Sequence, residues 1–171
     1  MGGIVVLVAA SKSFIKEATQ EVVVNKQEET VSLAVNKESP NFELNDIEGN
    51  KVKRSDFLGT PLVLIFWTTW NNSSVDQLKI LDDYSSKTDS KPFKLVAINT
   101  QENFSQVSGF ISRGGYTLDV LFDESGEVGE AYKVKTLPTF YFIDKEGVMK
   151  TLHIGSLSQE EMVSKAEPAL K

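Results

Sequence analysis

The sequence predicts an α/β domain with a central mixed sheet flanked by helices. Two apolar runs, at residues 62–67 and 94–98, have the continuous hydrophobicity of strands that are buried on both faces. The segment between them carries apolar side chains at helical spacing, namely Val75, Leu78, Leu81 and Tyr84. A strand, a helix and a second strand in this order form a βαβ unit with parallel strands and a right-handed crossover.

Before this unit, the chain predicts a small N-terminal hairpin. Residues 42–44 and 51–53 flank the turn-rich segment 46–50, whose sequence is Asp-Ile-Glu-Gly-Asn. Ser55 and Asp56 then have the side chains to cap a short helical turn that ends at Gly59.

After the second apolar run, the pattern alternates between helix and strand to the end of the chain. A helix is predicted by apolar residues at helical spacing, namely Phe104, Val107, Phe110 and Ile111. A strand at 118–122 and a short helix through Val128 and Tyr132 follow. Beyond Pro138, residues 140–143 and 148–154 flank a turn at 144–147 and predict a hairpin. Ser158 and Glu161 form a capping box for a last helix, which Pro168 should end.

The composition excludes several classes of function. The chain has 171 residues, a net charge of -6 and no cysteine. An acidic chain without a basic stripe repels phosphate backbones, so nucleic acid is not expected as a partner. Without cysteine there is no thiolate nucleophile, no Cys-ligated zinc and no iron–sulfur cluster. With one histidine, His153, and no calcium-loop spacing, neither a metal nor a cofactor is expected.

Three segments are expected along the chain. Residues 1–10 are apolar but too short to span a bilayer, and they are interpreted as the remnant of a signal or membrane anchor, with a frayed terminus as the alternative. Residues 11–38 are rich in polar side chains and are interpreted as a tether. Residues 39–171 are expected to form the folded domain.

Four short motifs in the domain carry a family resemblance. They are Ser39-Pro40-Asn41-Phe42, Phe66-Trp67-Thr68-Thr69-Trp70, Leu137-Pro138-Thr139-Phe140 and Asp144-Lys145-Glu146-Gly147. In this order and spacing, they resemble the membrane-tethered thiol–disulfide oxidoreductases of the TlpA and ResA type, in the thioredoxin superfamily and related to the redoxin and AhpC/TSA proteins. The resemblance covers residues 39–171. It implies a thioredoxin-like fold, a cis proline at Pro138 and an extracytoplasmic, membrane-tethered or secreted protein.

The chain departs from this family at the residues that carry the chemistry. In the family, the tryptophan at position 70 is followed by Cys-x-x-Cys and often by a glutamate three residues later. Here the aligned residues are Asn71, Ser74 and Gln77. Disulfide exchange needs one thiolate to attack and a second thiol to displace it, and neither an amide nor a neutral hydroxyl does this. We therefore expect no dithiol–disulfide turnover.

The leading hypothesis is a redox-inactive module that binds a peptide or protein partner, most simply as a monomer. The groove is expected to contain Trp70, Asn71, Asn72, Ser73 and Ser74, with Thr136, Leu137 and Pro138 opposite. The helix end at this loop also favours an anion or a carboxylate.

Other interpretations stay open. In the simplest, Ser74 and Gln77 form a capping box, with Asn71 as the alternative cap, and only start a helix. An enzymatic alternative is an oxidoreductase of the TlpA/ResA type whose natural form has cysteines at 71 and 74. A peroxiredoxin-related protein shares the entry motif Ser39-Pro40-x-Phe42 but also needs a cysteine. Ser74 as a hydrolase nucleophile would need His153 as its base, and no nucleophile-elbow motif is present.

Overall fold

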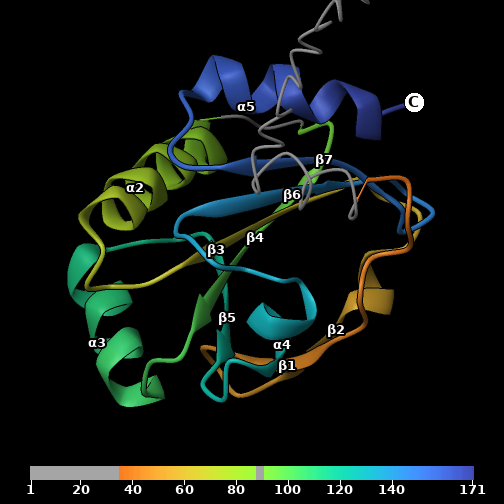
Figure 1. Cartoon of the computed structure of the whole chain (residues 1–171). Coiled ribbons are helices and arrows are strands. Elements are labelled where there is room, and N and C mark those ends of the chain that lie inside the picture. The colour runs from red at the N-terminus through yellow and green to blue at the C-terminus, as the bar shows by residue number, and fades with distance from the viewer. Residues whose placement is uncertain (1–34, 88–90) are drawn as a thin grey trace, which may run out of the picture.

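Seven strands form one mixed sheet in the order β2-β1-β5-β4-β3-β6-β7 (Figure 1). The structure is a computed structural model that describes residues 35–87 and 91–171. The segments expected at residues 1–10 and 11–34 lie outside the described residues. None of the helices in the described ranges has the length and apolar character needed to span a membrane.

The centre of the sheet is the predicted βαβ unit. β3 (Leu62–Trp67) and β4 (Lys94–Thr100) pair in parallel, and α2 (Asn72–Lys87) connects them. Every residue of β3 is buried, as its continuous apolar run predicts.

The other strands complete the sheet on both sides of this unit. β5 (Asp119–Asp123) follows α3 (Phe104–Gly114) and pairs in parallel with β4. β6 (Thr139–Ile143) pairs antiparallel with β3, and β7 (Met149–Ile154) antiparallel with β6. The N-terminal hairpin of β1 (Glu43–Asp46) and β2 (Lys51–Lys53) is added to β5. The predicted fold class, with its mixed sheet and hairpin extension, is confirmed.

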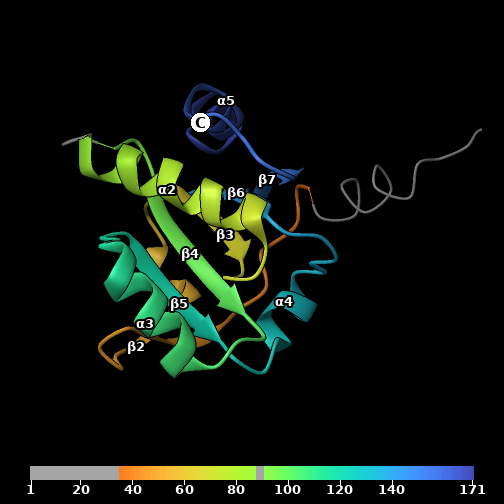
Figure 2. The same ribbon diagram turned by 90° about the vertical axis from the view of Figure 1, so that its left-hand side faces the viewer.

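Alternate residues of β3 serve two hydrophobic cores, one on each face of the sheet. Val63, Ile65 and Trp67 pack with apolar side chains of α2, α3 and α5 (Gln159–Ala166). Leu62, Leu64 and Phe66 pack on the other face, which α4 (Glu127–Ala131) covers through Val128. Figure 2 shows α2 and α3 on one side of the strands and α4 on the other.

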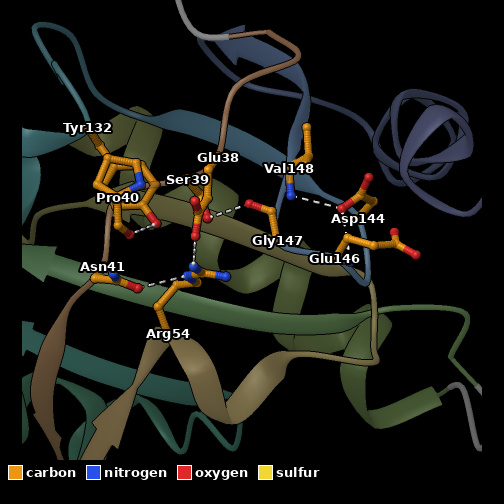
Figure 3. Close-up of polar contacts among 10 residues, drawn as sticks. All are labelled: Glu38, Ser39, Pro40, Asn41, Arg54, Tyr132, Asp144, Glu146, Gly147 and Val148. Atoms are coloured by element: carbon orange, nitrogen blue, oxygen red, sulfur yellow. Dashed lines mark hydrogen bonds and ion pairs between the residues drawn. The ribbon is translucent and has the colours of Figure 1, made fainter.

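The first described residues are fastened to the turn between β6 and β7 (Figure 3). The Asn36 N–H donates to the Met149 carbonyl at 2.7 Å, and Ser39 donates to the Gly147 carbonyl at 2.9 Å from both its N–H and its hydroxyl. Residues 36–38, which were expected in the tether, therefore pair with the domain. Because Ile143 lies opposite Leu62, this attachment is at the amino end of β3.

Two helix termini differ in detail from their predictions. In the 3-10 turn η1 (Arg54–Phe57), the Asp56 carboxylate accepts a hydrogen bond from the Lys53 N–H at 2.8 Å, whereas Ser55 makes no capping hydrogen bond. The Ser158–Glu161 capping box of α5 is present as predicted. The α-helix ends before Pro168, but the chain continues as a 3-10 turn, η2 (Glu167–Ala169).

Candidate functional site

The residues of the predicted groove meet at the carboxyl end of β3. The loop from Thr68 to Asn71 leads from β3 into α2. Opposite it, the Leu137–Pro138 peptide bond is cis, directly before β6. The pairing of Phe66 with Thr139 brings these two chain segments together, although they are far apart in the sequence. Ligands of open α/β sheets bind at this end of the strands.

Asn71, at the position of the first cysteine in the resemblance, joins the helix to the opposite loop. Its side-chain oxygen accepts a hydrogen bond from the Ser74 N–H at 2.9 Å, and its carbonyl accepts from the Val75 N–H at 3.0 Å. Its amide nitrogen donates to the Leu137 carbonyl at 3.5 Å. Asn71 is therefore the N-cap of α2, and the capping box expected to begin at Ser74 is wrong. Its oxygen also takes one N–H that the expected anion would have used.

Ser74, at the position of the second cysteine, lies inside the first turn of α2 and is 0% exposed. Its hydroxyl has no hydrogen-bond partner among residues 35–87 and 91–171. Ser74 therefore cannot contact a partner directly, which corrects its expected place in the groove. Because the hydroxyl makes no hydrogen bond to His153, the two residues do not form a Ser–His catalytic pair within the described part of the chain.

Gln77 is equally buried and performs a structural task. Its side-chain oxygen accepts a hydrogen bond from the Leu157 N–H at 2.7 Å, which ties α2 to the chain between β7 and α5. Within the described ranges, its side-chain nitrogen has no partner. Gln77 thus faces the interior and does not face the groove.

The accessible part of the site centres on Trp70, whose side chain is 69% exposed. Asn72 and Ser73 are also exposed, whereas Trp67 is fully buried and packs against Phe110. Beside Trp70 lies a cavity of about 390 Å³, a size typical of ligand sites. It is lined by Trp70, Asn71, Thr100, Gln101, Ser125, Gly126, Gly129, Glu130, Val134, Lys135 and Leu137.

The cavity includes only part of the predicted groove. Trp70, Asn71 and Leu137 line it. Thr136 is exposed outside the cavity, and Pro138 is buried beneath the loop. The cavity extends instead toward α4, whose residues Gly129 and Glu130 line it.

Glu102 supports the loop that presents Trp70 and is not among the predicted site residues. Its side chain is 8% exposed. One carboxylate oxygen accepts hydrogen bonds from the Thr69 N–H at 2.6 Å and from the Asn99 amide at 2.7 Å, and the other accepts from the Thr69 hydroxyl. The sequence does place it two residues after β4, and polar side chains at the carboxyl ends of parallel strands converge on the site.

A second buried carboxylate, that of Asp123, fixes the α4 wall of the cavity. It accepts hydrogen bonds from the Val128 N–H at 3.2 Å, the Gly129 N–H at 2.8 Å and the Thr100 hydroxyl at 3.0 Å. A Cβ at Gly129 would lie 3.0 Å from the Thr100 hydroxyl oxygen. The start of α4 is thus held tightly against the end of β4.

This arrangement has the features of a binding site and lacks the groups of a redox centre. The chain has no cysteine, and no three His, Asp or Glu side chains in the described ranges form a metal-binding group. His153 lies on β7 opposite Phe140, where burial lowers the pKa of its imidazole despite the opposing effect of the Ser156 carbonyl. An exposed aromatic side chain beside a cavity is typical of a surface that anchors a partner.

The sheet order, the two helical layers and the cis proline beside the α2 N-terminus define a thioredoxin-like domain. The AhpC/TSA family matches residues 35–152, and the chain belongs to this family. Within it, the chain is of the TlpA/ResA type. It is 29% identical over 130 residues to the thiol-disulfide oxidoreductase ResA of Bacillus thuringiensis, covering 76% of this chain and 75% of that protein.

Two solved structures show the same relationship. The exposed lipoprotein thioredoxin Etrx1 of Streptococcus pneumoniae has a TM-score of 0.68 at 25% identity, covering 75% of this chain and 98% of that one. StoA of Bacillus subtilis has a TM-score of 0.67 at 25% identity, with the same coverage. This chain is therefore similar to thiol–disulfide oxidoreductases in sequence and fold, but it has no thiol.

Proposed function

We propose that this chain is a redox-inactive TlpA/ResA-like domain that binds an extended peptide or a segment of a protein partner in the groove beside Trp70. The proposal depends on one combination of features: Trp70 is exposed, a cavity lies beside it, and Asn71 and Ser74 stand where the family has its reactive cysteines. The chain therefore keeps a surface that could bind a partner at this end of the sheet, although it lacks the cysteines for disulfide exchange.

The polar groups of the site support a binding role. Glu102 holds the backbone at Thr69, and Asn71 spans from α2 to Leu137, so the loop on each side of Trp70 is fixed before a partner arrives. A loop whose backbone is already ordered loses less conformational entropy on binding, which favours affinity. Backbone near Thr136 and Leu137 would pair with an extended segment by strand addition.

The binding experiment uses peptides selected from a random library on the purified full chain under reducing conditions. Trp70→Ala should weaken the selected peptides by about tenfold or more, as expected for an aromatic hot spot. Leu58→Ala is the matched control, because Leu58 is 51% exposed but is not part of the groove. Equal affinities of the wild-type protein and Trp70→Ala would exclude this groove.

The redox experiment is an insulin-reduction assay with dithiothreitol as the electron donor. The chain should not accelerate insulin precipitation above the rate without protein, because no residue supplies a thiolate. Any acceleration above a boiled sample would contradict the proposal. An Asn71→Cys/Ser74→Cys double variant serves as the positive control for the retained scaffold.

One observation favours a second candidate, an oxidoreductase whose natural form has cysteines at 71 and 74. The buried Ser74 hydroxyl has no partner in the described part of the chain, and a buried thiol tolerates this environment better because it behaves as a small apolar group. The Asn71 hydrogen bonds favour the first candidate. Sequencing codons 71 and 74 in genomic DNA separates the two.

We also propose that the protein works outside the cytoplasm, tethered through its N-terminal segment or secreted. The support is the relationship to an exposed lipoprotein thioredoxin and the position of the first described residues. These residues join the domain at the amino end of β3, whereas the groove lies at its carboxyl end. A tethered domain would therefore present its groove away from the anchor. Fractionation of cells that express the full chain tests the location.

A further inference from the structure

We propose a second docking site at the opposite end of the sheet, which takes a large apolar side chain of a protein partner flanked by lysine or arginine. The site is a cavity of about 360 Å³ between the tip of the N-terminal hairpin and the amino ends of β4 and β5. It is independent of the groove beside Trp70.

The position of the cavity follows from the strand register. Its lining includes Lys94 at the start of β4 and Asp119 at the start of β5, whereas the groove includes Thr100 at the end of β4. Lys94 and Thr100 are six residue steps apart along β4, which corresponds to roughly 20 Å. Both sites can therefore be occupied in one molecule.

The cavity opens beside an incomplete strand edge. β1 pairs with β5 only through Leu121 and Phe122 and then turns away at the hairpin tip. On this side, Asp119 and Val120 have no strand partner among the described residues. A strand edge of this kind presents an unpaired backbone N–H and C=O to an extended segment.

The walls are apolar and the rim is acidic. Ile47, at the mouth, is 38% exposed, and the half-buried apolar side chains of Val52, Phe57 and Tyr116 line the interior. The charged residues of the lining are Asp46, Glu48, Asp119 and Lys94. Three carboxylates and one ammonium give a net charge of -2, and the ammonium already pairs with Asp119.

This combination selects the chemistry of the occupant. Apolar walls favour an aliphatic or aromatic side chain, and the acidic rim favours lysine or arginine on either side of it. An anionic lipid surface or a phosphate would be repelled by the same carboxylates. A short extended peptide can interact with all three parts of the site: its backbone pairs with the strand edge, its apolar side chain enters the cavity, and its basic side chains approach the carboxylates.

The test is a titration of the isotope-labelled full chain, followed by backbone NMR shifts. The probes are acetyl-Lys-Val-Phe-Val-Lys-amide and its acidic counterpart, in which glutamate replaces both lysines. The basic peptide should give saturable shifts at Ile47, Val52, Phe57 and Leu118, and its affinity should fall as salt is raised. The acidic peptide should bind at least about fivefold more weakly.

Two surface variants place the interaction without disturbing the core. Ile47→Ala and Glu48→Gln should each weaken the basic peptide by about threefold to fivefold. Leu170→Ala and Glu160→Gln are matched controls on another surface, since Leu170 is also 38% exposed, and they should leave the affinity unchanged. The proposal is overturned by equal binding of the two peptides, by shifts that cluster at Trp70, or by no saturable shift at the cavity.

Discussion

Replacing Gly147 with alanine should destabilise the domain far more than the same change at a glycine of the same conformation. Gly147 has φ +87°, in the left-handed region, and lies in the turn between β6 and β7. A Cβ there would lie 2.1 Å from Nη1 of Arg54 (Figure 3). Gly49 also has φ +87°, but a Cβ there would meet no atom within 4 Å.

The guanidinium of Arg54 has little freedom to move away from such a Cβ. Arg54 is 5% exposed, its Nη2 is 2.8 Å from a Glu38 carboxylate oxygen, and its Nε donates to the Asn41 side-chain oxygen at 3.2 Å. The Gly147 carbonyl also accepts both hydrogen bonds from Ser39. A shift of either group would therefore loosen the attachment of the first described residues.

The two substitutions share one cost and differ in another. A left-handed alanine costs about 1 kcal/mol, which should be the whole effect at Gly49. At Gly147, overpacking against a buried group adds about 1–3 kcal/mol, for a total of about 2–4 kcal/mol. For a chain of this length, that lowers the Tm by about 5–15 °C.

Denaturant unfolding followed by tryptophan fluorescence measures the difference, because Trp67 is buried in the folded state. Arg54→Ala should relieve the clash, so the double variant with Gly147→Ala should be more stable than the sum of the single effects by about 1 kcal/mol or more. The reasoning is refuted if Gly147→Ala and Gly49→Ala agree within about 0.5 kcal/mol.

Three further predictions concern the site and the single histidine. Ser74→Ala should stabilise the domain by about 1 kcal/mol because it removes a buried hydroxyl without a described partner. The exposed control Ser73→Ala should change stability little, and a lower free energy of unfolding for Ser74→Ala would contradict the prediction. Asn71→Ala should cost about 1 kcal/mol through loss of the α2 cap, in contrast to Asn72→Ala, and equal unfolding midpoints would exclude the cap. Burial lowers the pKa of His153 below 6.5, so the unfolded chain binds the proton more readily than the folded chain does. The contribution of His153 to stability should therefore be lost as the pH falls below 6.5 and through the pKa of the folded state. An NMR titration with a midpoint at or above 6.5 would refute this.

The order and type of the elements could be predicted because each leaves a local pattern in the sequence. β3 is a continuous apolar run, α2 carries apolar residues at helical spacing, and the two hairpins surround turn-rich segments. The resemblance added the strand order, which periodicity alone does not specify.

The details of the site were less predictable because they depend on contacts between distant segments. Ser74 and Asn71 are both suitable caps by residue type, and only the entry of the chain from β3 determines that Asn71 caps the helix while Ser74 turns inward. Glu102 reaches Thr69 across 33 positions of sequence, and its place just after β4 indicates that it lies near the site but not that it contacts Thr69. The extension of the cavity toward α4 depends on tertiary structure in the same way.

The three positions that lack the family's chemistry now differ in how well they suit a domain without thiols. Asn71 uses an acceptor and a donor at once, toward Ser74 and Leu137, which a thiolate cannot do because it has no proton to donate. Gln77 bonds to the chain before α5, whereas Ser74 retains a buried hydroxyl without a described partner. A cysteine at 71 would therefore lose the hydrogen bond to Leu137, whereas a cysteine at 74 would replace a buried hydroxyl that has no described partner. This asymmetry indicates that Asn71 suits a domain without thiols, whereas Ser74 does not gain a hydrogen bond from the same environment.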